Sequence, residues 1–232
     1  MNTTEFSTTF ERNLQNFQNT FITLPDDYFF TEKELHSYFY HLCMKNKTFI
    51  LNDEFNLVHT EYPTPFKCSI ENEFPFIKMQ DITSKKVRSH IDTVLFNPNF
   101  IEWVYENKIS IECIKGLRNQ LYSEYIQDFI GIYSDFYRET NEPIFLYLLE
   151  FKFFRNGYVG TKYPLKSIKQ DIEKLLISKE FQMDFMNSKL PFTENILSLV
   201  FITRSNKNLL DVIENDPYIK SNDKYLRVIC KQ

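Results

Sequence analysis

Apolar side chains recur at helical spacing in three regions of the chain. The first region follows residues 31–34, Thr-Glu-Lys-Glu, which have the form of a helix-capping box. Its apolar positions are Leu35, Tyr38, Phe39 and Leu42. Residues 99–139 carry apolar side chains in steps of three, four or seven, and a third run begins at Leu165. Each pattern gives a helix one apolar face, so we expect helices in these regions and a shorter one at 209–213.

Other segments have the apolar pattern of β-strands. Residues 144–154 are apolar on both faces and interrupted only by Glu150 and Lys152, as expected for a central strand covered on both sides. Shorter apolar or alternating segments lie at 51–62, 87–96, 196–203 and 225–229. Asn156-Gly157 predicts a turn, followed by a short return strand at 158–163. This order of elements predicts an α/β fold with a mixed central sheet flanked by helices.

The chain of 232 residues contains no internal repeat and no linker rich in Pro, Gly or Ser. We therefore interpret residues 31–232 as one domain with a helical insert at about 99–139, preceded by an irregular N-terminal extension at 1–30. The sequence contains neither a secretory signal nor an apolar run of the length needed to span a bilayer. We accordingly expect a cytoplasmic protein without a membrane partner.

Composition excludes several classes of function. There are only 4 Gly residues, which argues against the glycine-rich loops of P-loop and dinucleotide-binding enzymes. The net charge of −4 argues against a broadly basic surface that neutralises many phosphates at once. Any contact with nucleic acid must therefore be local.

The charged pair inside the most apolar strand is the first candidate for chemistry. Glu150 and Lys152 are two residues apart, so they share a strand face, while Phe151 points the other way. Asp92 is a second carboxylate inside an apolar strand segment. Unpaired buried charges cost several kcal/mol, so each of these acids needs a partner. An ion pair between Glu150 and Lys152 is one explanation.

A metal ion is the other explanation. Hard divalent ions such as Mg²⁺ bind carboxylate and backbone carbonyl oxygens, so Asp92, Glu150 and the carbonyl group of Phe151 form a plausible partial set of ligands. Such an ion polarises a phosphate oxygen and lowers the pKa of bound water, while the adjacent Lys152 can orient that water. The reaction that fits these groups is phosphodiester hydrolysis.

Asp92, the strand sequence Glu150-Phe151-Lys152, and the helix and strand that follow resemble the PD-(D/E)XK nuclease superfamily. The resemblance spans roughly 31–203 and implies a restriction endonuclease-like core. It also implies that Asp92 and Glu150 bind Mg²⁺ or Mn²⁺ and that Lys152 assists the attacking water. The implied partner is nucleic acid, with DNA favoured, and cleavage of both strands of a duplex would favour a homodimer.

The resemblance also points to supporting residues. Members often carry an additional Glu from an early helix or strand, for which Glu61 is the first candidate and Glu34 the second. Lys169 and Gln170 resemble a helix residue that supports the site in several members. His90 shares a strand face with Asp92, where it could contact phosphate or have a purely structural role.

Basic residues are concentrated near the proposed metal site. Residues 151–179 contain seven basic residues and two acids, a local excess of positive charge in an acidic chain. The residues proposed to contact nucleic acid are Arg88, Arg155, Lys162, Lys166 and Lys169. The run could also be the solvated face of a helix.

Three functions are therefore considered. The first is a metal-dependent nuclease, and the second is a catalytically inactive relative that binds nucleic acid or protein. The third is a structural or regulatory domain whose many aromatic side chains mark a partner surface. Retention of the Asp, the Glu and the Lys favours the nuclease.

Overall fold

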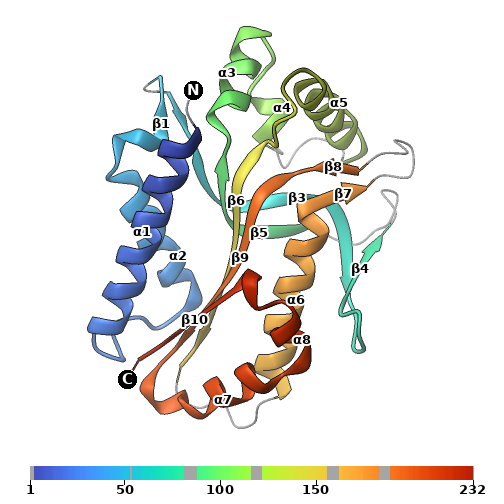
Figure 1. Cartoon of the computed structure of the whole chain (residues 1–232). Coiled ribbons are helices and arrows are strands. Elements are labelled where there is room, and N and C mark those ends of the chain that lie inside the picture. Colours follow the sequence, from blue (N-terminus) through green and yellow to red (C-terminus); the bar gives the residue numbers. More distant parts are fainter. Residues whose placement is uncertain are drawn as a thin grey trace.

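A computed structural model describes residues 3–52, 54–80, 88–115, 122–155, 162–182 and 189–231 (Figure 1). The helices are α1 (Thr3–Thr23), α2 (Glu32–Met44), α3 (Pro98–Glu106), α4 (Glu112–Lys115), α5 (Tyr122–Thr140), α6 (Lys162–Lys179), α7 (Asn208–Asn215) and α8 (Pro217–Ser221). The strands are β1 (Ile50–Leu51), β2 (Phe55–Asn56), β3 (Val58–Ile70), β4 (Ile77–Gln80), β5 (Arg88–Phe96), β6 (Phe145–Phe154), β7 (Glu180–Gln182), β8 (Lys189–Pro191), β9 (Thr193–Ile202) and β10 (Leu226–Cys230).

Within the described residues, six strands form a mixed central sheet in the order β10-β9-β6-β5-β3-β4. The pairs β10–β9 and β9–β6 are parallel, whereas β6–β5, β5–β3 and β3–β4 are antiparallel. The predicted α/β class with a mixed sheet flanked by helices is confirmed. Strand β6, which carries Glu150, pairs in parallel with β9 on one side and antiparallel with β5, which carries Asp92, on the other.

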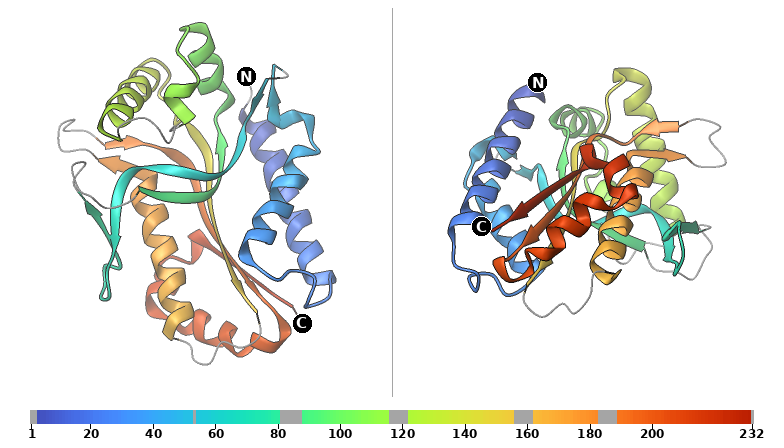
Figure 2. Two further views of the ribbon diagram at one scale, coloured as in Figure 1. Left: turned by 180° about the vertical axis from the view of Figure 1, so that it is seen from behind. Right: turned by 60° about the horizontal axis from the view of Figure 1, so that its bottom comes forward.

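Helices cover both faces of the sheet (Figures 1 and 2). On one face, Phe17 of α1 packs against Phe151 of β6 and Phe201 of β9. On the other face, Ile168 and Ile172 of α6 belong to a second apolar cluster. Both faces of β6 are therefore buried, which explains why its sequence is apolar at almost every position.

The N-terminal residues differ from the prediction of an irregular extension. They form α1, and Phe10, Phe17 and Phe21 on its inner face are almost completely buried in the main apolar core. Burial of an apolar side chain of this size contributes about 1.5–3 kcal/mol, so α1 is an integral part of the fold. Its apolar residues recur in steps of three and four, a helical signal that was present in the sequence.

Helix α2 begins where the capping box predicts. The Thr31 side chain accepts a hydrogen bond from the Glu34 backbone N–H, and the Glu34 carboxylate accepts from the Thr31 N–H at 3.0 Å. These reciprocal bonds satisfy backbone donors that a helix start leaves free. They also set the rotational phase of the first turn, and with it the directions of Glu32 and His36.

The remaining elements refine the predicted order. The predicted insert at 99–139 contains α3, α4 and α5, and β3 runs on to Ile70 before returning as β4. The predicted return strand at 158–163 lies partly outside the described residues, and its last two positions begin α6. No described helix is both long enough and apolar enough to cross a membrane.

Candidate functional site

The site begins where strands β5 and β6 separate. Their antiparallel register runs from the pair Phe96–Phe145 to the pair Thr93–Leu149. Beyond this point two carboxylates accept hydrogen bonds from the free edge of β6. Asp92 Oδ2 accepts the backbone N–H of Phe151 at 2.8 Å. Glu32 Oε2, at the start of α2, accepts the backbone N–H of Phe153 at 3.2 Å. Two acids from distant segments are thereby aligned along one strand.

Glu150 and Lys152 point from β6 toward α6, as their two-residue spacing predicts. Glu150 Oε2 contacts Lys174 Nζ at 2.6 Å, and the Glu150 side chain is only 1% exposed. The same ammonium group donates to the His90 carbonyl oxygen at 2.8 Å, which ties α6 to β5. Glu150 Oε1 is buried and has no hydrogen-bond partner among the described residues.

Lys152 lies between acids from two helices. Its Nζ is 3.1 Å from Asp171 Oδ2 on α6 and 3.5 Å from Glu32 Oε1 on α2. It also donates to the Phe151 carbonyl oxygen at 3.3 Å. The predicted ion pair between Glu150 and Lys152 is thus replaced by a larger arrangement, the acid–lysine cluster. Its members are Glu32, Asp92, Glu150, Asp171, Lys152 and Lys174.

The acid–lysine cluster carries an excess of negative charge. Four carboxylates face two ammonium groups, which leaves two negative charges uncompensated when all groups are ionised. This excess equals the charge of one divalent cation. Burying these charged groups costs free energy, and part of that cost shifts the pKa values of the cluster's side chains.

The pKa directions follow burial and neighbouring charge. Burial raises the pKa of Glu150 well above its usual range, with Asp92 and Asp171 adding to the effect of burial and Lys174 opposing it. Burial likewise raises the pKa of Asp171 to about 6, although Lys152 and Lys174 act against it.

Asp92, Lys152 and Lys174 instead have pKa values shifted toward their charged forms. Burial alone would raise the pKa of Asp92, but contact with His36, the charge of Lys174 and the N–H of Phe151 hold it below the usual value. Burial opposes the charge on Lys152, yet the neighbouring acids, Asp171 first, raise its pKa. Lys152 is therefore a cation at neutral pH.

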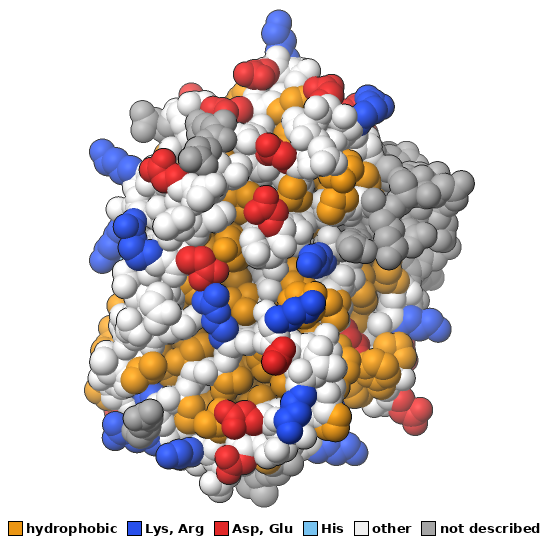
Figure 3. Space-filling view, in the orientation of Figure 1, with side chains coloured by type: hydrophobic (Ala, Val, Ile, Leu, Met, Phe, Trp, Pro, Cys, Tyr) orange, Lys and Arg blue, Asp and Glu red, His pale blue; other side chains and the backbone are white. Residues whose placement is uncertain are grey.

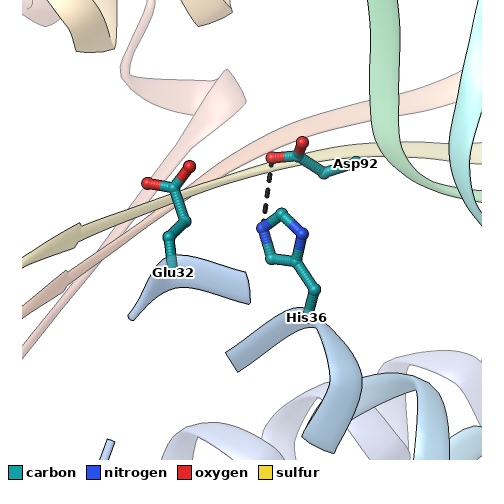
Figure 4. Close-up of side chains that lie close together, drawn as sticks. All are labelled: Glu32, His36 and Asp92. Carbon is teal, nitrogen blue, oxygen red and sulfur yellow. Dashed lines mark ion pairs between the residues drawn. The ribbon is translucent and has the colours of Figure 1, made fainter. Parts of the chain in front are cut away.

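A further group of side chains reaches Asp92 from α2. Glu32 and His36 are four residues apart, so they share a helix face, and both point toward the Asp92 carboxylate (Figure 4). The distance from His36 Nε2 to Asp92 Oδ2 is 3.3 Å. One ligand atom from each of the three residues lies within 4.8 Å of the others. Sequence reasoning missed Glu32 and His36, for which the i, i+4 spacing was the available signal.

The two predicted supporting acids lie elsewhere. Glu34, two residues from Glu32, is engaged in the capping box of α2. Glu61 is exposed on β3 with a positive φ of 53°, a conformation that non-glycine residues rarely adopt. It lines a small hollow of about 110 Å³ together with Lys33 and His36. Neither Glu34 nor Glu61 has a described ion pair with the acid–lysine cluster.

A cleft of about 550 Å³ opens beside the cluster. We call it the α6 cleft. Its lining comes from β6, α6 and the β3–β5 region: Lys152, Tyr163, Ser167, Gln170, Asp171, Lys174, Cys68, Ser69, Ile70, Ile77 and Ser89. The β4 strand is held over α6 because the Ile77 backbone N–H donates to Glu173 Oε2 at 2.8 Å. Gln170, one of the two candidate supporting residues on α6, is among the residues that line this cleft.

The predicted nucleic-acid contacts have separate environments. Lys169 Nζ forms an ion pair with Asp216 Oδ2 at 2.7 Å. Lys162 is exposed at the start of α6, Lys166 lies 3.5 Å from Asn72 Oδ1, and Arg155 lies over the Phe30 ring at 4.5 Å. On the face seen in Figure 3, basic and acidic side chains are interspersed.

Two residues of β5 complete the predicted set. The Arg88 backbone begins β5 and pairs with Lys67, but its side chain lies outside the described part of the chain. The His90 side chain is exposed, and its backbone carbonyl rather than its imidazole contacts Lys174.

Asp171 and Lys174 were not predicted as site residues. They are three residues apart on α6, so one helix face carries both toward β6, and both line the α6 cleft together with Gln170. Comparison with known proteins adds nothing to this geometry: neither protein-family models, nor curated proteins, nor solved structures gave a match to the chain.

Proposed function

We propose that the protein is a metal-dependent phosphodiester hydrolase that cleaves nucleic acid, with the acid–lysine cluster as its active site. The observation that carries the proposal is the gathering of four carboxylates around only two ammonium groups, Lys152 and Lys174, at the edge of an open cleft, with Glu150 and Asp171 buried. A purely structural ion-pair network would be expected to balance its charges, because an uncompensated buried carboxylate is costly.

The donor set fits a hard divalent ion. Carboxylate and carbonyl oxygens are the ligands that Mg²⁺ and Mn²⁺ accept, and Asp92, Glu150 and the Phe151 carbonyl supply them within one stretch of β5 and β6. Glu150 Oε1, buried without a hydrogen bond among the described residues, offers an oxygen for this purpose. When bound, the ion would polarise a phosphate oxygen and make water a stronger nucleophile.

The protein's own groups supply the rest of the chemistry. The Phe151 N–H fixes the orientation of Asp92. Lys152, kept protonated by its acidic neighbours, can donate hydrogen bonds to the attacking water and offset the charge that develops on the phosphoryl oxygens. Because Lys152 retains its proton, its role is orientation and charge stabilisation rather than proton abstraction.

The α6 cleft provides a route for the substrate. Its volume falls within the range of small-ligand sites and accommodates a nucleotide-sized part of a polymer. Lys162 and Lys166 on the first turns of α6 could contact backbone phosphates, which position a strand without reading its sequence. We propose DNA as the substrate class, and a homodimer if both strands of a duplex are cut.

This set of roles matches the PD-(D/E)XK pattern, so we propose membership of that superfamily. The main alternative is an inactive relative that binds nucleic acid or protein. One observation favours it: Lys174 Nζ contacts Glu150 at 2.6 Å, where a metal ion would otherwise compensate the carboxylate. An ammonium group that permanently replaced the ion would leave a binding module.

Cleavage assays decide between these functions. The protein is incubated with linear duplex, circular and single-stranded DNA, and with RNA, in Mg²⁺, in Mn²⁺ or in EDTA. We expect metal-dependent cleavage that falls by about 100-fold or more in Lys152→Ala, a typical cost of losing a positioned catalytic group. Lys220→Ala, on the exposed surface of α8, is the matched control and should cleave at the wild-type rate. Absence of cleavage with every substrate, or equal cleavage by Lys152→Ala, would refute the hydrolase.

A further inference from the structure

We infer that Glu32 and His36 of α2 form, together with Asp92, a metal site that binds a divalent transition-metal ion such as Mn²⁺ in preference to Mg²⁺. The inference deepens the proposed function, on which its catalytic meaning rests, because Asp92 belongs to both sets of ligands. One carboxylate oxygen of Glu32, one of Asp92 and one imidazole nitrogen of His36 lie within 4.8 Å of one another.

Local structure directs these side chains to a common point. The capping box sets the phase of α2, so residues one turn apart project in the same direction. The His36 ring packs against the Phe151 ring with centroids 4.7 Å apart. Figure 4 shows the Glu32 carboxylate and the His36 ring on the same side of α2, both directed toward Asp92.

The state of His36 points to a missing ligand. Its side chain is only 7% exposed, and its Nε2 atom has no hydrogen-bond partner of adequate geometry among the described residues. Leaving a buried polar group unsatisfied costs about 1–3 kcal/mol. Nε2 lies next to the Asp92 carboxylate, so an ion between the two would satisfy the nitrogen and the oxygen together.

The distances allow an ion after a small adjustment. Ligands bound at about 2.0–2.2 Å from one ion lie at most about 4.4 Å apart. The observed limit of 4.8 Å therefore requires a movement of a few tenths of an ångström. Glu32 can supply it, because its side chain is 37% exposed and its contact with Lys152, at 3.5 Å, is long.

The imidazole determines which ion is preferred. Mg²⁺ favours a shell of oxygen ligands and gives up its waters reluctantly, whereas first-row transition-metal ions bind imidazole nitrogen readily. Two carboxylates and one imidazole should therefore bind Mn²⁺ more tightly than Mg²⁺. By contrast, Asp92, Glu150 and the Phe151 carbonyl offer only oxygen atoms.

Calorimetric titration of the EDTA-treated full chain tests the preference. MnCl₂ and MgCl₂ are titrated separately into the wild type, His36→Gln, Glu32→Gln and His41→Gln, with thermal unfolding followed to verify that each variant is folded. His41 is an exposed histidine on the same helix and serves as the matched control. We expect tighter binding of Mn²⁺ than of Mg²⁺, with Mn²⁺ affinity lowered by about 10- to 100-fold in His36→Gln and unchanged in His41→Gln. Equal affinity for the two ions in the wild type would overturn the inference.

Pulsed electron paramagnetic resonance of bound Mn²⁺ tests the ligand directly. Coordination by an imidazole couples the ion to a ¹⁴N nucleus, and we expect this coupling in the wild type and in His41→Gln but not in His36→Gln. Its absence from the wild type, or its persistence in His36→Gln, would overturn the assignment.

The two proposals fail in different ways. Lys152→Ala should lower cleavage by about 100-fold or more and keep the ¹⁴N coupling. If bound Mn²⁺ shows the ¹⁴N coupling but neither the wild type nor any variant cleaves nucleic acid, the metal site is supported and the hydrolase is refuted. Cleavage without nitrogen coupling would support the hydrolase and refute the role of His36.

Discussion

Replacing Lys174 by Met should destabilise the protein strongly, because it removes one partner of a buried ion pair. The Lys174 side chain is 13% exposed and that of Glu150 is 1% exposed, and their charged atoms are 2.6 Å apart. The variant leaves Glu150 without its nearest cation and removes the bond from Lys174 to the His90 carbonyl. Breaking a buried pair from one side costs about 3–5 kcal/mol.

Urea unfolding followed by circular dichroism at pH 7 measures this effect. A loss of 3–5 kcal/mol corresponds to a decrease in melting temperature of roughly 6–20 °C in a chain of this size. Lys162→Met, at the exposed start of α6, is the matched control and should change the free energy of unfolding by less than about 0.5 kcal/mol.

A double-mutant cycle with Glu150→Gln separates the ion pair from other effects of the substitution. Because Gln carries no charge, Lys174→Met combined with Glu150→Gln should cost about 2 kcal/mol less than the sum of the two single variants. Mg²⁺ at ten times its dissociation constant should return about 1.4 kcal/mol to Lys174→Met, since a cation can then compensate Glu150. A loss below about 1 kcal/mol in Lys174→Met, or strictly additive variants, would show that the pair behaves like a surface ion pair and would refute this reasoning.

Two further predictions concern the scaffold. Phe17→Ala, which removes a fully buried ring between α1 and the sheet, should lower the free energy of unfolding by about 3–5 kcal/mol in urea, and a change below 1 kcal/mol would show that α1 is peripheral. Asp216→Asn should destabilise by about 1 kcal/mol at pH 7, because Asn keeps the N-cap of α8 but loses the charge that pairs with Lys169. Burial alone would raise the pKa of Asp216, but the Lys169 contact and the backbone N–H groups of α8 lower it, so its stabilisation is present above the unfolded pKa and is lost as the pH falls through the folded pKa. The difference between wild type and Asp216→Asn, measured from pH 7 to pH 2, should therefore shrink below about pH 4, and a constant difference would contradict the assignment.

Several features were predictable because they depend on short-range geometry. The two-residue period of a strand places Glu150 and Lys152 on one face, and apolar residues on both faces mark β6 as a central strand. The capping box marks the start of α2 and also shows that Glu34 is engaged by its own helix turn. The capping box engages Glu34 but not Glu32, so the Glu32 side chain is available for the contact that it makes with β6.

Glu61 shows where such rules fail. The family resemblance made Glu61 the first candidate for an additional acid at the site, but the backbone turns into the left-handed region at Glu61 and the side chain is exposed. The four-residue spacing of Glu32 and His36 was visible in the sequence, yet spacing alone does not say which neighbour their helix face meets.

The sequence by itself therefore determined the fold class, the central strand β6 and the shared face of Glu150 and Lys152. These features depend on the two-residue period of strands and on the three- and four-residue spacing of apolar positions in helices. Only the tertiary structure decided which helices supply the remaining charges. Asp92 and Glu32 meet because β5 leaves β6 after the Thr93–Leu149 pair and exposes two backbone N–H groups that need acceptors. Asp171 and Lys174 join them because α6 packs across the same part of β6. Contacts of this kind arise between segments about 20 to 120 residues apart in the chain, beyond the range of any local pattern.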